Sequence, residues 1–412
     1  MSFADEARAL DAADPLSAAR DLFILPDGVI YLDGNSLGAL PRATAPRVAQ
    51  VIEREWGERL IRSWNSDADA GPGWIDLPQR VGAKIASLIG AAGHEVIACD
   101  STSVNVFKLV AAALKLRPGR RAIVSEPGNF PTDIYMIQGL QQLGLAEQRL
   151  AEPEAIIDAL DDDVAAVLLS HVHYKTGRVH NMAAITAAAH AAGALAIWDL
   201  SHSAGAIKVD LSGCNADLAV GCGYKYLNGG PGAPAYLYVA ERLQPDIANP
   251  LPGWMGHSAP FSFADAYAPA AGITRMLTGT PQILGLAALE SGVEIIAALG
   301  MPALLAKSSA LTDFFIRAVA ATCPSLGLIS PAFSEQRGSH VALRHPEAYA
   351  ICQALIARGV IGDFRDPDVL RLGFTPAYLG FAEVWRAVEQ IAAVLNMREW
   401  DQPQHRHRLV VT

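Results

Sequence analysis

Five short apolar segments alternate with helical segments between about residues 85 and 240, and this alternation limits the possible folds more than any other feature. The segments are AIVSE (122–126), AAVLLSHV (165–172), LAIWDL (195–200), LAVGCGY (218–224) and AYLYVA (235–240). Strands that are apolar on both faces belong in a sheet that helices cover on both sides. The sequence therefore predicts a doubly wound, mainly parallel α/β sheet.

The segments between these strands are typical of helices. NMAAITAAAHAAG (181–193) is rich in alanine and stops at Gly193, where a glycine favours the end of a helix. Proline and glycine become frequent from 249 to 281, and a new strand and helix pattern begins near residue 325. We expect a large domain over residues 61–300, a smaller carboxy-terminal α/β domain over 301–412, and an amino-terminal segment, 1–60, that joins the small domain.

Composition narrows the class of protein. The 412 residues are 51% hydrophobic and 18% charged, which is enough apolar material for a large core. The net charge of −10 argues against nucleic acid as a partner and favours a small molecule. The five cysteines are scattered and include no CxxC pair, so we expect a reducing compartment and no zinc site. The acidic amino terminus and the lack of a long apolar run indicate a cytoplasmic protein with no membrane segment.

Residues whose side chains could bind a ligand or take part in catalysis follow the predicted strands. Ligands of open parallel sheets bind at the carboxyl ends of the strands, so these positions are the first candidates for a site. They are Phe130 and Asp133 after the first segment, Asp199 and His202 after LAIWDL, and Tyr224 and Lys225 after LAVGCGY. Each also has a structural explanation when taken alone, because an aspartate often caps a helix, a histidine often fills a hydrogen-bonded core site and GGPG often forms a turn.

Together these residues fit one cofactor, pyridoxal phosphate. This cofactor needs a lysine for covalent attachment, a carboxylate at its ring nitrogen, a flat side chain on its ring face and a cup for its phosphate. Lys225 suits the first role, since an apolar setting lowers the pKa of its amine, while Asp199 suits the ring nitrogen and Phe130 the ring face. Residues 101–103 (Ser-Thr-Ser) open a predicted helix whose amino-terminal N–H groups favour a phosphate dianion. The 26-residue spacing between Asp199 and Lys225 fits one crossover between adjacent parallel strands.

Several longer motifs extend this pattern. They are YLDGNSLG (31–38), FPTD (130–133), SHVHYKTGRVHNM (170–182), DLSHSAGA (199–206), GCGYKYLNGGPG (221–232) and GWMGH (253–257). In these motifs, and over about residues 28–380, the chain resembles the kynureninase family of pyridoxal phosphate enzymes. The resemblance implies the fold type I architecture of pyridoxal phosphate-dependent transferases, with a large cofactor-binding domain and a small carboxy-terminal domain, and a homodimer. It also implies hydrolysis of L-kynurenine, or of its 3-hydroxy derivative, to L-alanine and anthranilate or 3-hydroxyanthranilate, a step of tryptophan catabolism and NAD biosynthesis.

The resemblance also implies roles for individual residues. Lys225 would be the covalent cofactor lysine and the base that removes the α-proton, and Tyr224 would bind phosphate and relay protons. Arg371, in VLRLGF, would grip the substrate's α-carboxylate; the alternative is a surface arginine paired with Asp366 or Asp368. The remaining cofactor contacts would be Thr102, Ser103, Phe130, Pro131, Thr132, Asp133, Ser170, Asp199 and His202, with Trp254 and Thr280 completing the phosphate cup across the dimer interface.

Two details and three alternatives stay open at this stage. Thr280 stands where some family members have asparagine, and the preferred substrate depends on aryl-ring contacts from residues such as Trp64.

The first alternative is a cysteine desulfurase or a class V aminotransferase, which would share the fold and the lysine. A desulfurase needs an exposed, mobile cysteine, whereas Cys352 lies in a predicted helix and Cys323 precedes a proline.

A metal hydrolase is the second alternative. His171 and His173 would lie on one face of a strand, with His180 nearby, although no HExxH motif or carboxylate partner accompanies them. The third is a ligand-binding or scaffold protein without catalytic activity.

Overall fold

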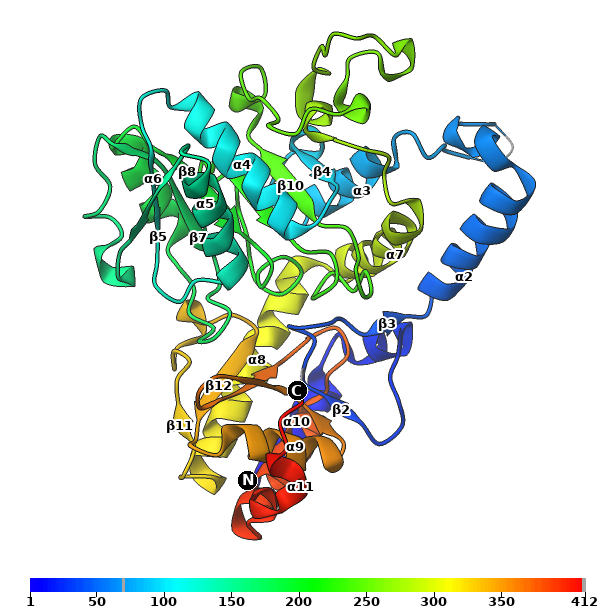
Figure 1. Cartoon of the computed structure of the whole chain (residues 1–412). Coiled ribbons are helices and arrows are strands. Elements are labelled where there is room, and N and C mark those ends of the chain that lie inside the picture. The colour runs from blue at the N-terminus through cyan, green and yellow to red at the C-terminus, as the bar shows by residue number, and fades with distance from the viewer. Residues whose placement is uncertain (69–70, 410–412) are drawn as a thin grey trace.

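Among the described residues, the two largest sheets lie one above the other in Figure 1, and the amino terminus lies beside the lower one. The computed structural model describes residues 1–68 and 71–409. The upper sheet has seven strands and the lower sheet has four. Helices pack around both of them, as the α/β prediction requires.

The seven-stranded sheet confirms the mainly parallel arrangement. Its order is β4 (Val96–Ala98), β10 (Tyr236–Val239), β9 (Leu218–Gly221), β8 (Leu195–Asp199), β7 (Val164–Ser170), β5 (Ala122–Ser125) and β6 (Glu147–Leu150). Only β10 runs antiparallel to its neighbours, β4 and β9. All five predicted strands are present. The sequence pattern did not show β4, which has three residues, or β6, whose residues EQRL are mostly polar and are all at least partly exposed because the strand lies at the edge.

Helices cover both faces of this sheet. On one face lie α4 (Thr102–Leu116) and α5 (Pro131–Gln142), and on the other lie α3 (Leu77–Ala86), α6 (Met182–Ala191) and α7 (Ile283–Leu299). Two hydrophobic clusters form, one on each side, which explains why the strands between them are apolar throughout. Gly193 follows α6 with a φ of 75°, a left-handed conformation that glycine adopts without steric cost, so the predicted helix end is confirmed.

The lower sheet is antiparallel, in the order β11 (Gly327–Leu328), β12 (His340–Arg344), β15 (Val369–Gly373) and β14 (Asp363–Arg365). The helices around it are α8 (Met301–Thr322), α9 (Ala348–Ala357), α10 (Phe381–Asn396) and α11 (Pro403–Arg406). The amino-terminal segment reaches this sheet region, since β2 (Ile30–Tyr31) pairs with β13 (Val360–Ile361) and α1 (Phe3–Ala13) packs on α10. The boundaries at residues 60 and 300 stay predictions.

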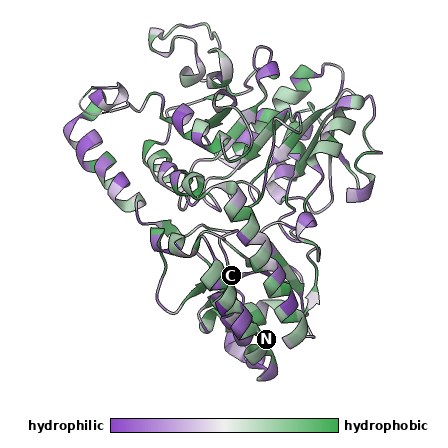
Figure 2. Ribbon diagram, turned by 180° about the vertical axis from the view of Figure 1, so that it is seen from behind, coloured by the Kyte–Doolittle hydropathy of each residue, from purple (hydrophilic) through white to green (hydrophobic). Residues whose placement is uncertain are grey.

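A helical arm projects from the body beside the two sheets (Figure 1). It follows the short pair β1 (Phe23–Ile24) and β3 (Leu40–Pro41) and consists of α2 (Thr44–Gln50) and a π-helix, η2 (Val51–Glu58). Figure 2 shows that the arm is mainly hydrophilic, whereas the strands of the large sheet are mainly hydrophobic. This contrast shows that the large sheet, and not the arm, forms part of the hydrophobic core.

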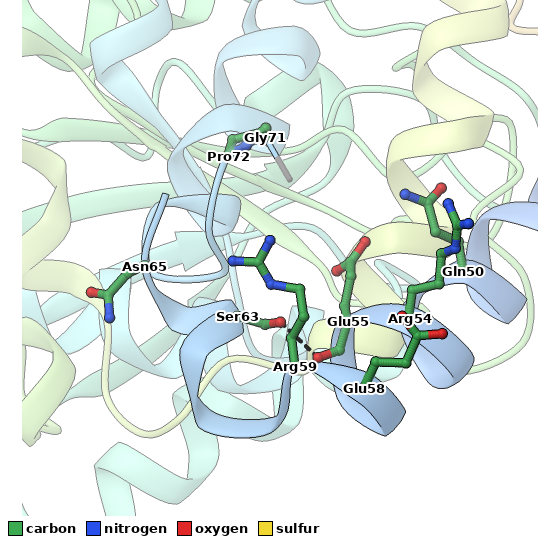
Figure 3. Close-up of a pocket in the computed structure, with 9 residues that line it drawn as sticks. All are labelled: Gln50, Arg54, Glu55, Glu58, Arg59, Ser63, Asn65, Gly71 and Pro72. Atoms are coloured by element: carbon green, nitrogen blue, oxygen red, sulfur yellow. Dashed lines mark hydrogen bonds between the residues drawn. The ribbon is translucent and has the colours of Figure 1, made fainter. Parts of the chain in front are cut away.

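A cavity of about 260 Å³ lies at the end of the arm (Figure 3). Glu55 fixes its wall by accepting hydrogen bonds from Arg47 at 2.7 Å and from the Trp74 indole at 2.6 Å. Its lining is polar and includes Arg54, Glu58 and Arg59, and it lies apart from the residues predicted to bind the cofactor. It is therefore not the predicted site.

Among the described residues, no single helix is both long and apolar enough to cross a bilayer. The pair α7 and α8 passes that test of length and composition only jointly, with a bend of 84° between the two helices.

Candidate active site

Lys225 lies in a tight turn just after β9 and is buried. Its Nζ atom is 3.3 Å from His202 Nε2, 5.6 Å from the ring centre of Phe130 and 5.8 Å from that of Tyr224. Burial lowers the pKa of Lys225, although Cys222 and Asp199 oppose this shift. The turn thus holds an amine in the apolar surroundings that favour its reactive, neutral form.

Two buried carboxylates lie close to this amine. Asp199 ends β8, the strand adjacent and parallel to β9, and accepts a hydrogen bond of 2.8 Å from the backbone N–H of Ser201. Neither carboxylate oxygen of Asp133 has a hydrogen-bond partner among the described residues, because the neighbouring Ser170 donates to Asn129 instead. Burial raises the pKa of both aspartates, and that of Asp133 rises further because Asp199 is nearby.

Two helix amino termini meet beside these carboxylates. Thr102 begins α4 and Pro131 begins α5, and the hydroxyls of Ser103 and Thr132 are 3.0 Å apart across the junction. Unpaired N–H groups and the positive ends of two helix dipoles therefore converge, and small hydroxyl donors surround them. This is an arrangement suited to a phosphate dianion.

Trp254 and Thr280 do not join this group within one chain. Trp254 is 38% exposed in a 3₁₀ turn and its ring packs edge-on against Phe261. Thr280 is exposed and lines a small cavity with Cys99 and Asp100, just before α4. No hydrogen bond or ring contact within the described ranges links either residue to Lys225, so their part in the phosphate cup stays a prediction.

Arg371 is buried on β15, with only 2% of its surface exposed. Its Nε donates to Asp363 Oδ1 at 2.8 Å, its Nη2 donates to the other oxygen of Asp363 and to Ser36 Oγ, and its Nη1 donates to the Tyr174 carbonyl at 2.5 Å. The alternative of a surface arginine is therefore wrong. The two proposed partners bind elsewhere: Asp366 pairs with Arg408, and Asp368 pairs with Arg344.

The three histidines of the metal alternative have separate partners. β7 ends at Ser170, so the expectation that His171 and His173 share a strand face is wrong. His171 Nδ1 bonds Ser203 Oγ at 2.9 Å, His173 Nε2 bonds the Gly128 carbonyl at 2.9 Å, and His180 bonds the buried carboxylate of Glu126. Over residues 1–68 and 71–409, no three histidine, cysteine, aspartate or glutamate side chains are grouped to hold a metal.

The cysteines do not favour a desulfurase. Cys323 and Cys352 are both buried, and Cys352 lies within α9, as the sequence predicts. Burial also raises the pKa of both thiols, which keeps them protonated. A desulfurase needs a thiolate that can reach its substrate, and neither cysteine meets that requirement.

Several features fit pyridoxal phosphate. The buried amine of Lys225, the unpaired oxygens of Asp133 and the paired helix termini of α4 and α5 are groups that such a ligand would satisfy. Asp199 lies at the end of the strand beside that of the lysine, where it can face a ring nitrogen. The fold and the site together define the chain as a fold type I pyridoxal phosphate protein.

Comparison with solved structures supports this fold. A cysteine desulfurase from Thermococcus onnurineus NA1 superposes with a TM-score of 0.77 at 19% identity, covering 92% of this chain and 98% of that one. The protein C-DES, in a structure with glycine covalently linked to its PLP cofactor, also gives a TM-score of 0.77, at 16% identity over 90% of this chain and 98% of that one. At these identities the likeness concerns the fold.

Comparison with sequences identifies the family. A kynureninase from Deinococcus radiodurans is 54% identical over 95% of this chain and 96% of its own length. Kynureninases from Burkholderia mallei and Pseudomonas fluorescens are 50% and 49% identical and match over the full length of both chains. The model of the kynureninase C-terminal domain matches residues 304–391. The chain belongs to the kynureninase family, whose cofactor is pyridoxal phosphate.

Sequence reasoning did not identify two groups that the structure places at this site. One is Asp363, which with Ser36 holds the guanidinium of Arg371; with its amide oxygen turned toward that group, Asn35 accepts from Arg371 Nε at 3.0 Å. The other is His340, on the strand beside Arg371. The signal for Asp363 was the alternation of β14 and β15, and the signal for His340 was that of β12 and β15; both need the register of the paired strands to be useful.

Proposed function

We propose that the chain is a hydrolase acting on a carbon–carbon bond, which converts L-kynurenine and water to anthranilate and L-alanine. The 3-hydroxy derivative of kynurenine would react in the same way. Membership of the kynureninase family supports this reaction. The observation on which it depends most is the buried amine of Lys225 between His202 and Phe130, because a lysine in that setting serves covalent chemistry better than stability.

The lysine has two tasks in this proposal. When bound, pyridoxal phosphate supplies an electron sink for bond cleavage at the substrate's amino-acid carbons. Lys225 Nζ holds the cofactor until the substrate arrives, and then removes the proton from the substrate's α-carbon as a neutral amine. Burial favours both tasks, since it lowers the pKa of the amine.

Tyr224 is suited to deliver a proton. Burial raises the pKa of its phenol, so the group stays protonated at neutral pH and can donate to the fragment that becomes alanine. Its ring lies next to Lys225 Nζ, which places the proposed donor and the proposed base on the same side of the site.

Arg371 would orient the substrate through its α-carboxylate. Its guanidinium is held by Asp363, Ser36 and the Tyr174 carbonyl, so little conformational entropy is lost when the substrate binds. A fixed carboxylate fixes the direction of the bond that must break, which is the usual source of rate from positioning.

The test uses purified protein supplied with pyridoxal phosphate and L-kynurenine. We expect anthranilate fluorescence to appear with an equal amount of L-alanine, and Lys225→Ala to abolish it. Parallel assays with L-cysteine should release no sulfide. A protein that binds the cofactor but forms no anthranilate from either kynurenine or 3-hydroxykynurenine would refute the proposed reaction, and the ratio of kcat/KM for the two substrates would show which is preferred.

We also propose a homodimer in the cytoplasm, acting in tryptophan catabolism and NAD biosynthesis. Exposed apolar side chains on the arm, just after it and on the loop after Trp254 support the dimer: Trp56 is 57% exposed, Ile61 76% and Phe263 77%. A second copy covering them could also bring Trp254 and Thr280 to the phosphate cup. Sedimentation would show a dimer, and Trp56→Glu with Ile61→Glu should shift it toward monomer.

A further inference from the structure

His340 is fully buried on β12, yet neither of its ring nitrogens has a hydrogen-bond partner among the described residues. This is uncommon, since buried polar groups in folded proteins are nearly always paired. The neighbouring buried histidines differ: His171 and His173 each bond a defined acceptor or donor. An unpaired buried imidazole costs stability, so a position that keeps one is a candidate for binding a ligand.

The strand register puts His340 beside Arg371. In the antiparallel pair β12 and β15, His340 lies opposite Gly373, and Ala342 lies opposite Arg371. Residues two apart on a strand share a face, so His340 and Arg371 project from the same face of the small sheet. Gly373 contributes no side chain between them, and Asn35 occupies the space that a Cβ would take there.

On its other sides, the ring of His340 lies near His202, which neighbours Lys225, and against Gly177. Its ring centre is 5.5 Å from that of His202, whose Nε2 is 3.3 Å from Lys225 Nζ. Gly177, at a φ of 74°, covers the Nε2 edge of the ring so closely that an added Cβ would lie 3.3 Å from that nitrogen. His340 therefore stands between the proposed base and the proposed carboxylate arginine.

The protonation state of the ring fits a hydrogen-bond donor. Burial, and then the charge of Arg371, lower the pKa of His340 well below its usual value, so the imidazole is neutral and carries one N–H. Arg371 already directs its Nε and Nη2 groups to Asp363 and Ser36 and its Nη1 to a backbone carbonyl. A carboxylate that approaches Arg371 thus finds few free N–H groups there and needs another donor.

We propose that His340 is a substrate-binding residue that donates an N–H to the α-carboxylate beside Arg371. The substrate would supply the partner that the imidazole lacks. This inference rests on the proposed function for the identity of the substrate, but its central claim concerns any α-amino acid that binds next to Lys225.

The test compares two ligands that divide the substrate between them. L-alanine carries the α-carboxylate and anthranilate carries the aryl ring. For the cofactor-loaded wild type, His340→Leu and His340→Gln, the dissociation constant of each ligand is measured by calorimetry, and kcat and KM for L-kynurenine are measured alongside. His345→Gln is the matched control, because His345 lies just beyond the same strand and accepts from the Glu347 N–H.

We expect His340→Leu to weaken L-alanine binding about tenfold, the equivalent of roughly 1.4 kcal/mol, and to leave anthranilate binding unchanged. His340→Gln keeps an N–H donor and should recover part of the loss, while His345→Gln should match the wild type. The urea midpoint and the cofactor absorbance of each variant show whether it is folded and loaded; if the leucine variant fails either check, the glutamine variant still tests the donor.

Two results would overturn the proposal: L-alanine binding that is unchanged in both His340 variants, or a loss confined to anthranilate. The proposed reaction fails separately. If the wild type forms no anthranilate from kynurenine but binds L-alanine in a His340-dependent way, then the reaction is refuted and the carboxylate role of His340 stands.

Discussion

The substitution Asp363→Asn would remove the charge of this side chain and keep its size and shape nearly unchanged. In the wild type this carboxylate, whose side chain is 2% exposed, accepts from Arg371 through both oxygens and from Arg365 at 2.7 Å and Ser36 at 2.6 Å. Removing one partner of a buried ion pair costs about 3 to 5 kcal/mol, because the other charge stays buried. Asparagine keeps one acceptor oxygen, so we expect Asp363→Asn to lower the free energy of unfolding by about 3 kcal/mol.

The same substitution should affect catalysis. Without two charged oxygens at Asp363, the guanidinium of Arg371 would lose the orientation that positions the substrate's carboxylate. KM for L-kynurenine should therefore rise and kcat should fall. A combined loss of tenfold in kcat/KM corresponds to about 1.4 kcal/mol. Cofactor absorbance should not change, because no hydrogen bond of Asp363 reaches Lys225 or the helix termini of α4 and α5 within the described part of the chain.

Asp368→Asn is the control for both effects. Asp368 also pairs with an arginine, Arg344 at 3.1 Å, but the two side chains are 30% and 63% exposed, and such surface pairs contribute at most about 1 kcal/mol. Urea denaturation and steady-state kinetics of the two variants decide the matter. If Asp363→Asn is no more damaging than Asp368→Asn in either assay, then the buried pair does not hold Arg371 as we describe.

The pH dependence gives an independent check on Asp363. Burial alone would raise the pKa of this carboxyl, but the charge and hydrogen bonds of Arg371, with further contributions from Arg365 and Ser36, together outweigh burial and hold the pKa at about 2, below its value of about 3.9 in the unfolded chain. A lowered carboxyl pKa stabilises the fold above the unfolded pKa, and this contribution is lost as the pH falls through the folded one. The stability difference between wild type and Asp363→Asn should therefore shrink between about pH 4 and pH 2.

Three further outcomes are expected. Lys225→Ala should bind pyridoxal phosphate only reversibly, so dialysis should remove its absorbance, and retained absorbance would exclude Lys225 as the point of attachment. Burial and then the charge of Asp363 raise the pKa of Asp33 to about 8, so the wild type should lose stability as the pH rises from about 4 to 8, whereas Asp33→Asn should not; parallel urea midpoints for the two proteins across that range would contradict this. Gly38→Ala puts a Cβ against the Lys225 carbonyl and the Asn228 backbone, so it should cost about 1 to 3 kcal/mol and weaken cofactor binding. Gly139→Ala, inside α5 with open space around it, should slightly raise thermal stability, because alanine favours a helix over glycine.

The large sheet could be predicted from the sequence because its strands are buried on both faces and so are apolar throughout. Lys225 and Asp199 could be predicted for a related reason: Asp199 ends the apolar strand β8, Lys225 lies in the turn after the apolar strand β9, and a charged residue stands out at such positions. The edge strand β6 carries no such signal, because one side of it meets solvent. Where a residue's place depends on a strand end, the sequence pattern is therefore informative.

The small-sheet half of the site could not be predicted in the same way. Arg371 and Asp363 are eight positions apart and meet only because β14 and β15 pair with these two residues opposite each other. Asp366 and Asp368 are nearer in sequence but lie in and beside the turn between the strands, where their side chains meet Arg408 and Arg344. The role of His340 is harder still to predict from the sequence. Its distinguishing property is that its ring nitrogens lack a hydrogen-bond partner among the described residues, and only the packed structure shows this.

The two halves of the site come from different sheets. The segment YLDGNSLG contacts both halves and so helps to fix their relative position. The N–H of Gly38 donates to the Tyr224 carbonyl at 2.8 Å, next to the lysine turn. Two residues earlier, Ser36 donates to Asp363 and accepts from Arg371 at 3.0 Å. One short loop therefore contacts both the turn that carries the proposed base, Lys225, and the arginine that would orient the substrate. A change in this segment should therefore alter cofactor and substrate binding together.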